Sequence, residues 1–297
     1  MIDTKYISLI KVAELGSFTR AAEALSLSQP AVTQHIKQLE DTFEISLFTR
    51  SRGNLQLTKE GEVVVKYAKR MAAMENNLAQ ELRNEKERIR SLNVGITHTA
   101  ESSVIIEALA GYVSRIDSLN LKILTGTTES LSRMLNNYEL DFAFVEKENP
   151  SDSLMYTALG TDKIVLAVAP EHPLAKHDMI TIPELMQERL ILRLPDSNTR
   201  NLFVSSLESQ NLSLDDFNVV IEIDSVATIK DLIRRNFGVS VMAKSACMDE
   251  YLKGKLALLP IEKLSMERTA YMVCRKDFEH PELIRGIAEA YRKLQNK

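Results

Sequence analysis

Polar side chains of the kinds that contact DNA bases stand on one face of an expected helix near the N-terminus. Val32, Ile36 and Leu39 recur there at helical spacing, so they predict the buried stripe of the helix. A glutamine can bond to both edge groups of an adenine, a threonine can contact a thymine methyl, and a lysine can reach guanine or phosphate. The outward face carries such residues: Gln29, Thr33, Gln34 and Lys37.

The start of this helix and the segment after it hold further candidates for the same contact. Ser28 is the expected N-cap, and Pro30 lies in the first turn. Residues 47–58 predict a short hairpin around a turn at 51–54. Arg50 and Arg52 in that hairpin are placed to reach the DNA backbone or the minor groove. The same pattern also fits a generic three-helix domain with a solvated polar face.

A second set of polar residues follows expected strands in the rest of the chain. Open α/β sheets bind ligands at the carboxyl ends of their strands, which is where these residues stand. Hydroxyl groups and free backbone N–H groups at helix starts suit an anion, and an arginine can clamp a carboxylate. The candidate ligand-binding residues are Thr97, His98, Thr99, Thr127, Thr128, Asn198, Thr199, Arg200 and Ser225.

Each of these candidates also has a plainer interpretation. Any single Ser or Thr could serve only as an N-cap. His98 could be a pH-sensitive partner of an anion or a hydrogen-bonded structural histidine. Arg200 could be one more surface arginine near a pocket. Glu146, directly after an expected strand, could repel or orient a ligand.

The elements that must position the first set are helices. Apolar stripes predict short helices over residues 6–13, 18–25 and 32–43, in a helix-turn-helix arrangement. Residues 62–94 then contain no Gly or Pro, which predicts a helix of about 30 residues. Such a helix, with a coiled-coil-like seam, could pack that seam on its own domain, but its length and exposed polar faces favour a helix that pairs with another chain. The seam consists of Tyr67, Met71, Met74, Leu78 and Leu82.

The rest of the chain alternates expected strands and helices. The first series has strands over 92–97, 121–125 and 142–145, with helices over 104–113 and 131–138. The second has strands over 164–169, 190–192, 219–223 and 239–242, with helices starting at Thr199 and Ser225. This order predicts parallel strands with crossover helices, in two lobes with a cleft.

Length and composition are those of an ordinary globular protein of about two domains. The 297 residues are 44% hydrophobic and 26% charged, which excludes a collagen-like or disordered chain. The longest apolar run, 164–169, is too short to cross a bilayer, and no signal core is visible, so we expect a cytoplasmic protein without a membrane partner. Residues 1–90 hold 14 basic and 12 acidic side chains and the remainder 23 and 29, which suits two parts with different partners.

Other kinds of chemistry find little support. His172 and His177 lack the spacing and the third ligand of a zinc site, and Cys247 and Cys274 are more typical of buried thiols than of a redox pair. No phosphate-binding loop, nucleophile elbow or dinucleotide-binding turn is present. An enzyme on the two-lobed part is the least favoured alternative, because no acid–base pair stands out. We expect no catalytic residues, no metal and no cofactor.

A series of ordered motifs runs through the chain. The first half carries SFTRAAEAL at 17–25, LSQPAVTQHI at 27–36, LE at 39–40, LFTR at 47–50 and LTKEG at 57–61. Farther on come APEHPLA at 169–175, SNTR at 197–200 and NFGV at 236–239. These motifs resemble those of the LysR-type transcriptional regulators, and the resemblance covers the whole chain.

The resemblance implies a fold and a division of the chain. The fold is α/β with an α-rich N-terminal winged helix-turn-helix, a long linker helix and a two-lobed effector domain like type 2 periplasmic-binding proteins. The DNA-binding domain is expected at 1–58, the linker and dimerisation helix at 59–90 and the effector domain at 91–297. Lobe I is expected at 91–160 plus 266–297, and lobe II at 161–265.

The resemblance also implies a function. It indicates a homodimer or homotetramer that binds an interrupted inverted repeat in double-stranded DNA, responds to a small-molecule effector, often an anion, and has RNA polymerase as a partner. Its base-contacting positions fall on Gln29, Pro30, Thr33 and Gln34, with Arg52 reaching from the wing, and its effector-contacting turns match Thr99 and Thr128.

Two of these positions depart from the family pattern. Thr33 stands where serine is usual and Gln34 where arginine is common, so the operator sequence of relatives does not carry over. The alternative to a sensor is an oligomeric DNA-binding protein that responds to no effector.

Overall fold

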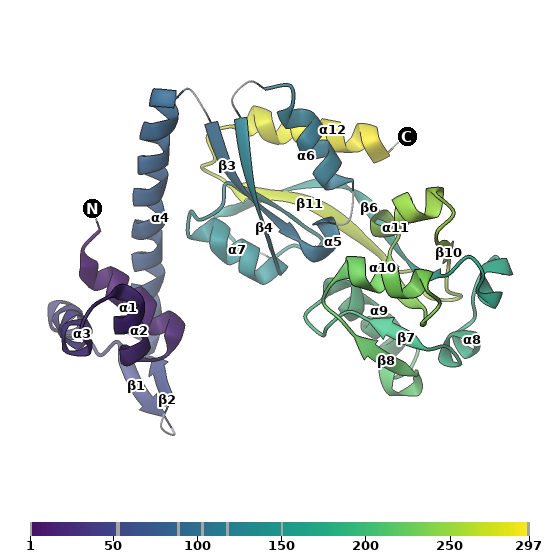
Figure 1. Cartoon of the computed structure of the whole chain (residues 1–297), viewed down its shortest axis with the longest axis horizontal. Coiled ribbons are helices and arrows are strands. Elements are labelled where there is room, and N and C mark those ends of the chain that lie inside the picture. The colour runs from purple at the N-terminus through teal and green to yellow at the C-terminus, as the bar shows by residue number, and fades with distance from the viewer. Residues whose placement is uncertain are drawn as a thin grey trace. The chain divides into compact units, whose positions relative to one another are not determined.

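The computed structural model describes residues 2–51, 54–87, 90–101, 104–116, 119–149 and 151–295 (Figure 1). The chain forms two compact units, one over residues 1–91 with 136–139 and one over residues 92–135 and 140–297. In the part of the chain that is described, no helix combines the length and the apolar character needed to span a bilayer.

The first unit contains a helix-turn-helix, a hairpin and a long helix. Its first three helices begin at side-chain caps, because Asp3, Ser17 and Ser28 each accept a hydrogen bond from the first turn. These helices and the hairpin confirm the elements predicted from the apolar stripes. The elements are α1 (Thr4–Leu15), α2 (Phe18–Leu25), α3 (Gln29–Phe43), the antiparallel strands β1 (Phe48–Ser51) and β2 (Asn54–Leu57), and α4 (Lys59–Glu87).

A small hydrophobic core fixes the orientation of α3. Val32, Ile36 and Leu39 are buried as predicted, and they belong to cores that also contain Leu9 and Val12 of α1. The polar residues of α3 therefore face solvent.

The start of α4 lies close to the chain segment before β1. A Cβ atom built on Gly61 would lie 2.2 Å from the carbonyl oxygen of Leu47, a contact that only glycine permits. The Thr58 amide donates to the same carbonyl at 3.0 Å, and the Gly61 amide donates to the Thr58 hydroxyl at 2.9 Å. This tight junction ties the long helix to the helix-turn-helix.

The second unit is built around a mixed sheet. The prediction of parallel strands is therefore wrong for several of its strand pairs. β3 and β5 are parallel, but β11 is antiparallel to both β5 and β6, and β6 is antiparallel to β9 and β10. The order is β10-β6-β11-β5-β3-β4, with β9 also paired to β6. The strands are β3 (Arg90–Thr97), β4 (Leu119–Gly126), β5 (Phe142–Val145), β6 (Leu154–Val168), β9 (Ser240–Ala243), β10 (Ala257–Leu259) and β11 (Glu267–Arg275).

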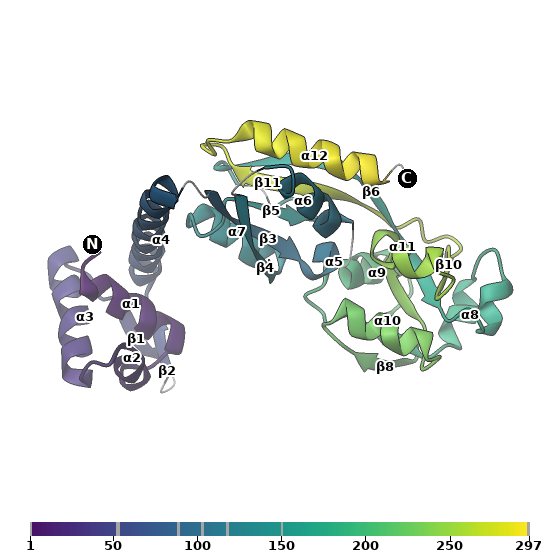
Figure 2. The same cartoon turned by 45° about the horizontal axis from the view of Figure 1, so that its top comes forward.

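One hydrophobic core of this unit gathers residues from 92–159 and 270–291, which we call lobe I. Figures 1 and 2 show α6 (Ile105–Val113) and α12 (Pro281–Gln295) over one face of its sheet and α7 (Thr128–Asn136) over the other. Phe142 and Phe144 of β5 are fully buried in this core. A short helix, α5 (His98–Glu101), follows β3 and was not predicted.

A second core lies within residues 164–266, which we call lobe II. Its small parallel pair, β7 (Leu190–Leu192) and β8 (Val219–Glu222), has the strands that the sequence predicts. Phe203 and Ile229 are fully buried in this second core. The helices are α8 (Ile182–Met186), α9 (Asn198–Glu208), α10 (Val226–Arg234) and α11 (Lys244–Leu252), with 3-10 turns at η1 (Pro173–Lys176) and η2 (Leu214–Asp216).

Two long strands belong to both lobes. The strand expected over 164–169 is the end of the 15-residue strand β6, and β11 was not predicted. The two pair from Leu154 opposite Arg275 to Lys163 opposite Glu267, with one irregularity at Ala270/Tyr271. They therefore carry the chain from lobe I into lobe II and back.

Candidate functional site

The outward face of α3 is polar and exposed, as the sequence predicts. Ser28, Gln29, Pro30, Thr33, Gln34 and Lys37 are all exposed. The face forms a shallow hollow that also includes Gln38 and Asp41, which were not predicted. Residues 33, 37 and 41 lie one turn apart, so the same helical spacing that identified Thr33 also indicates Asp41.

Two of these side chains are hydrogen-bonded to each other. The Gln29 side-chain amide donates to the Thr33 hydroxyl at 2.8 Å, and that hydroxyl donates to the Gln29 backbone carbonyl at 3.0 Å. Ser28 accepts from the Ala31 amide at 3.3 Å and so acts as the N-cap. The Gln29 carbonyl oxygen and amide are held at the exposed N-terminal end of α3, where a groove-reading helix contacts base edges.

The candidate wing residues are only partly described. The backbone of Arg50 lies in β1, opposite Leu55. The Arg50 side chain and the whole of Arg52 lie outside the described residues.

The predicted seam of α4 is an exposed apolar stripe. Met74, Leu78 and Leu82 are 55%, 57% and 59% exposed, and Tyr67 and Met71 are also exposed. Val63, 54% exposed, extends the stripe by one turn and was missed because the predicted repeat began at Tyr67. Val65 and Ala68 of the same helix are buried, so the helix has one covered face and one uncovered apolar face.

In the second unit, a small cavity lies between the two lobes. Its volume is about 20 Å³, room for roughly one water molecule. Lobe I provides the ends of β3, β4 and β5, and lobe II provides the segment after β7. The lining residues are Thr97, His98, Thr99, Gly126, Thr127, Thr128, Glu146, Arg193, Asp196, Ser197 and Asn198.

The structure brings together most of the predicted ligand-binding residues but not all. Thr97, Thr127 and Ser225 act as N-caps, because they accept bonds from the amides of residues 100, 130 and 228. Thr97 and Thr127 nevertheless line the cavity, whereas Ser225 does not. Arg200 also lies apart from the cavity lining and pairs with Glu222. The Asn198 side chain donates to the Thr128 hydroxyl at 3.0 Å and so joins the lobes.

The arginine of the cavity wall is Arg193, which sequence reasoning missed. It directly follows the buried strand β7. The rule that open α/β sheets bind ligands at the carboxyl ends of their strands, here called the strand-end rule, indicates this position. The residue is 7% exposed, and its Nη2 donates to Asp224 at 2.8 Å. Its Nε is buried and has no hydrogen-bond partner within the described part of the chain. His98 lies 3.6 Å from the same Asp224, a second contact between the lobes.

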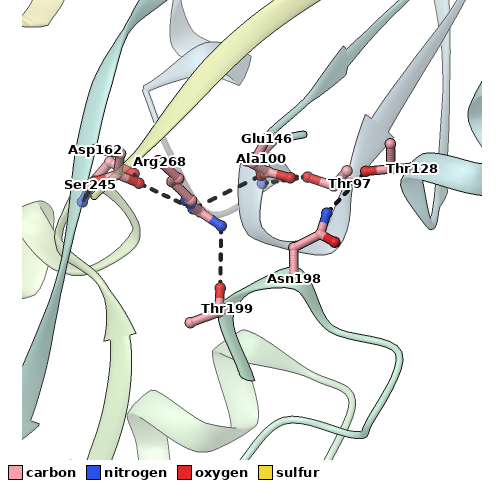
Figure 3. A network of polar contacts seen from close by, with 9 residues as sticks. All are labelled: Thr97, Ala100, Thr128, Glu146, Asp162, Asn198, Thr199, Ser245 and Arg268. Carbon is pink, nitrogen blue, oxygen red and sulfur yellow. Dashed lines mark hydrogen bonds and ion pairs between the residues drawn. The ribbon is translucent and has the colours of Figure 1, made fainter. Parts of the chain in front are cut away.

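Behind the cavity lies a buried network of charges (Figure 3). Figure 3 shows Arg268 of β11 between Asp162 of β6 and Thr199 of α9, with Glu146 nearby. The Arg268 guanidinium donates to Asp162 at 3.0 Å and to the Thr199 hydroxyl at 3.1 Å, and it lies 3.9 Å from Glu146. Asp162 also accepts from the amide and hydroxyl of Ser245, at 3.1 and 2.7 Å. The network therefore links both lobes through the two crossing strands.

The cysteines and histidines outside this cavity have structural surroundings. Both cysteines are free and buried, and burial raises the pKa of Cys274 and raises that of Cys247 to about 12. His172 and His177 pair with glutamates at 3.3 Å. Among the described residues, no group of His, Cys, Asp or Glu is arranged to hold a metal ion.

Comparison with known proteins settles which family carries this combination of a helix-turn-helix and a two-lobed domain. Residues 6–62 match the family of bacterial regulatory helix-turn-helix proteins of the lysR type, and residues 85–295 match the LysR substrate binding domain. The chain belongs to the LysR family. It is 27% identical to the HTH-type transcriptional regulator CysL of Bacillus subtilis, over 88% of this chain and 87% of that protein. It is 28% identical to CfxR of Cupriavidus necator, over 87% of this chain and 81% of that protein.

Solved structures of LysR regulators share the fold. The superposition on the LysR family regulator CbnR covers 99% of this chain and 99% of CbnR, with a TM-score of 0.68 at 15% sequence identity. The structure of CbnR in complex with its target DNA gives a TM-score of 0.67. This LysR-family chain is therefore a DNA-binding transcriptional regulator with an effector-binding domain, as predicted. Its families and relatives are regulators and not enzymes.

Proposed function

We propose that this LysR regulator binds an interrupted inverted repeat as a homodimer or a dimer of dimers. In this proposal residues 1–58 read DNA, 59–90 pair two copies and 91–297 bind the effector, in lobes with the boundaries expected from the sequence. Ser28, Gln29, Pro30, Thr33, Gln34 and Lys37 contact the major groove, and Arg50 and Arg52 contact the backbone or minor groove.

The exposed stripe of α4 supports the dimer. Tyr67, Met71, Met74, Leu78 and Leu82 expose an apolar surface along a helix whose other face is already covered. Such a heptad-like stripe is typical of a helix that pairs with a second copy. Two copies related by a two-fold axis would present two α3 helices to two half-sites of a palindrome.

The cavity between the lobes supports a small anion as the effector. The starts of α7 and α9 meet there, and the buried Arg193 adds a positive charge. Thr97, His98, Thr99, Thr127, Thr128 and Asn198 form the wall, and Thr199 lies in the network behind it. Arg200 and Ser225 act indirectly in this proposal, because they bond elsewhere.

Effector binding controls DNA binding in this proposal by changing how the lobes meet. The Asn198–Thr128 and His98–Asp224 contacts join the lobes at and beside the cavity. A ligand that separates or tightens these contacts binds the two arrangements with different affinity and so shifts their populations. The protein acts in the cytoplasm, where its DNA and RNA polymerase are present.

The observation that carries the proposal is that one chain has both an exposed polar face on α3 and a cavity between the two lobes. The test is selection of genomic fragments by the purified protein, with and without pooled metabolite anions. We expect an interrupted palindrome beside a promoter and a footprint that changes with one metabolite. Recovery of random fragments would refute sequence-specific reading, and a footprint that no metabolite alters would refute the sensor function.

A further inference from the structure

We propose that the effector carries a hydrogen-bond-donating cationic group, in the simplest case an amino group, beside its anionic group. The inference rests on the proposed effector site and names the chemistry of its ligand. It follows from a buried carboxylate, Glu146, in the wall of a cavity that also offers hydroxyl groups, helix starts and the buried Arg193 to an anion.

The charge of Glu146 is only partly compensated. Its side chain is 6% exposed, and its Oε1 accepts from the Thr97 hydroxyl at 2.6 Å. The nearest cation, Arg268, is 3.9 Å away, beyond hydrogen-bonding distance. A buried carboxylate is stabilised by a paired charge and by hydrogen bonds, and Glu146 has one hydrogen bond and an ion pair that it shares with Asp162.

Arg268 is engaged by a second carboxylate. It donates to Asp162 at 3.0 Å and to Thr199 at 3.1 Å, and these bonds define where its guanidinium lies. One guanidinium therefore serves two buried carboxylates, and Glu146 is the one without a direct bond. This leaves a net negative charge on the lobe I side of the cavity.

The lobe II wall offers hydrogen-bond donors at the start of α9 and on Arg193, and it also carries Asp196, while Arg193 is paired with Asp224. Ser197 precedes α9 but makes no side-chain cap bond, so the first-turn amides of α9 lack a side-chain cap. Arg193 beside them is more than nine-tenths buried, and its Nε has no partner in the described structure. Unpaired donors at a helix start, with a buried guanidinium, form a site for a carboxylate or a similar anion.

A ligand that satisfies both walls is dipolar. Its anionic group would face Arg193 and the start of α9, and its ammonium group would donate to Glu146. A simple anion in the same small cavity would lie close to the Glu146 charge and be repelled by it. The geometry therefore points to an α-amino acid or a comparable small zwitterion, which would enter as the lobes separate, because the cavity in this arrangement holds roughly one water molecule.

The test compares probes that differ by one group. Binding of the standard α-amino acids to the full-length protein is measured by calorimetry and thermal shift, together with counterparts lacking the amino or the carboxyl group, such as L-alanine, propanoate and ethylamine. We expect at least one amino acid to bind about tenfold or more tightly than either counterpart, since each loses one charge-assisted contact. Equal binding of the deamino acid, or no binding by any amino acid, would overturn the inference.

A pair of variants tests the role of Glu146 directly. Glu146→Gln is expected to weaken binding of the amino acid about tenfold or more and to strengthen binding of its deamino counterpart. Glu148→Gln, at an exposed position two residues along, is expected to change neither. Loss of both ligands in Glu146→Gln would indicate a structural role and contradict the proposal.

Failure of this inference is distinguishable from failure of the proposed function. Operator binding is measured on the same wild-type preparation. Specific DNA binding that no amino acid alters, but that a simple anion does alter, would reject the dipolar ligand and leave the regulator function standing. Loss of sequence discrimination by the wild-type protein would reject the regulator function itself.

Discussion

Arg268 gives the sharpest prediction on stability, because within the described structure it is the cationic partner of two buried carboxylates. Replacing it with glutamine removes the positive charge from a site in which the guanidinium side chain is 6% exposed. Asp162 and Glu146 then remain buried without a cation at hydrogen-bonding or ion-pairing distance.

The size of the effect follows from the two distances. At an effective dielectric constant of about 20, charges 3.0 Å apart attract by about 5 kcal/mol and charges 3.9 Å apart by about 4 kcal/mol. Rehydration of the freed groups offsets part of this, and breaking a buried pair from one side costs about 3–5 kcal/mol in practice. We expect Arg268→Gln to lower the free energy of unfolding of the second unit by that amount.

The assay is hydrogen exchange in peptides from β6 and β11, measured over a urea series, because it reports on the second unit alone. Arg234→Gln on α10 is the matched control. Its partner is Asp231, one turn away on the surface, and such exposed pairs contribute about 0.5 kcal/mol or less.

The network also predicts an order among variants. Asp162 accepts from Arg268 and twice from Ser245, whereas Glu146 has no direct bond to Arg268. Asp162→Asn is therefore expected to destabilise more than Glu146→Gln and less than Arg268→Gln. A loss in Arg268→Gln no larger than that in Arg234→Gln would refute the reasoning.

Four further outcomes are expected. Gln29→Ala lowers affinity for the operator by about 1–3 kcal/mol but leaves binding to a random duplex nearly unchanged in a titration; equal losses on both would contradict the assignment. Met74→Asp gives monomers in light scattering, whereas Asn76→Asp on another face of α4 keeps the mass of the wild type. Gly61→Ala destabilises the first unit by about 1–3 kcal/mol, although alanine has the better helix propensity. Gly111→Ala, whose added Cβ would have no atom within 4 Å, stabilises α6. Hydrogen exchange in α4 and α6 measures both effects. Burial raises the pKa of Cys247 from 9.0 to about 12, so the folded state favours the neutral thiol. The contribution of this group to the free energy of unfolding is therefore fully present below pH 9 and falls by up to about 1.4 kcal/mol per pH unit above it. Cys247→Ala should remove that slope in urea titrations.

Local patterns predicted the first unit well. The stripe of Val32, Ile36 and Leu39 fixed both the existence and the orientation of α3, because one buried face determines which residues face out. The long helix followed from the absence of Gly and Pro, and its exposed stripe from a single repeat. These features depend on residues close together in the sequence.

The second unit shows where such reasoning ends. Arg268 and Asp162 are 106 residues apart and become cross-strand neighbours only through the pairing of β11 with β6. No local pattern specifies that register. The strand-end rule did place Thr97, Thr128 and Glu146 at one cavity, and applied after β7 it would have chosen Arg193 over Arg200. Arg200 was predicted because it also follows an expected strand and could clamp a carboxylate, but its pairing with Glu222 is set by the fold.

The two crossing strands make lobe II a single insertion into lobe I. The chain enters through β6 and returns through β11, and Lys163 lies opposite Glu267 at the boundary. Segments whose two ends are adjacent can be exchanged as units with few broken contacts. Arg193, Asp196, Ser197 and Asn198 would travel together in such an exchange, while Thr97, Thr128 and Glu146 would stay. Exchange of this one segment would therefore replace one wall of the cavity and leave residues 1–91 and the opposite wall unchanged.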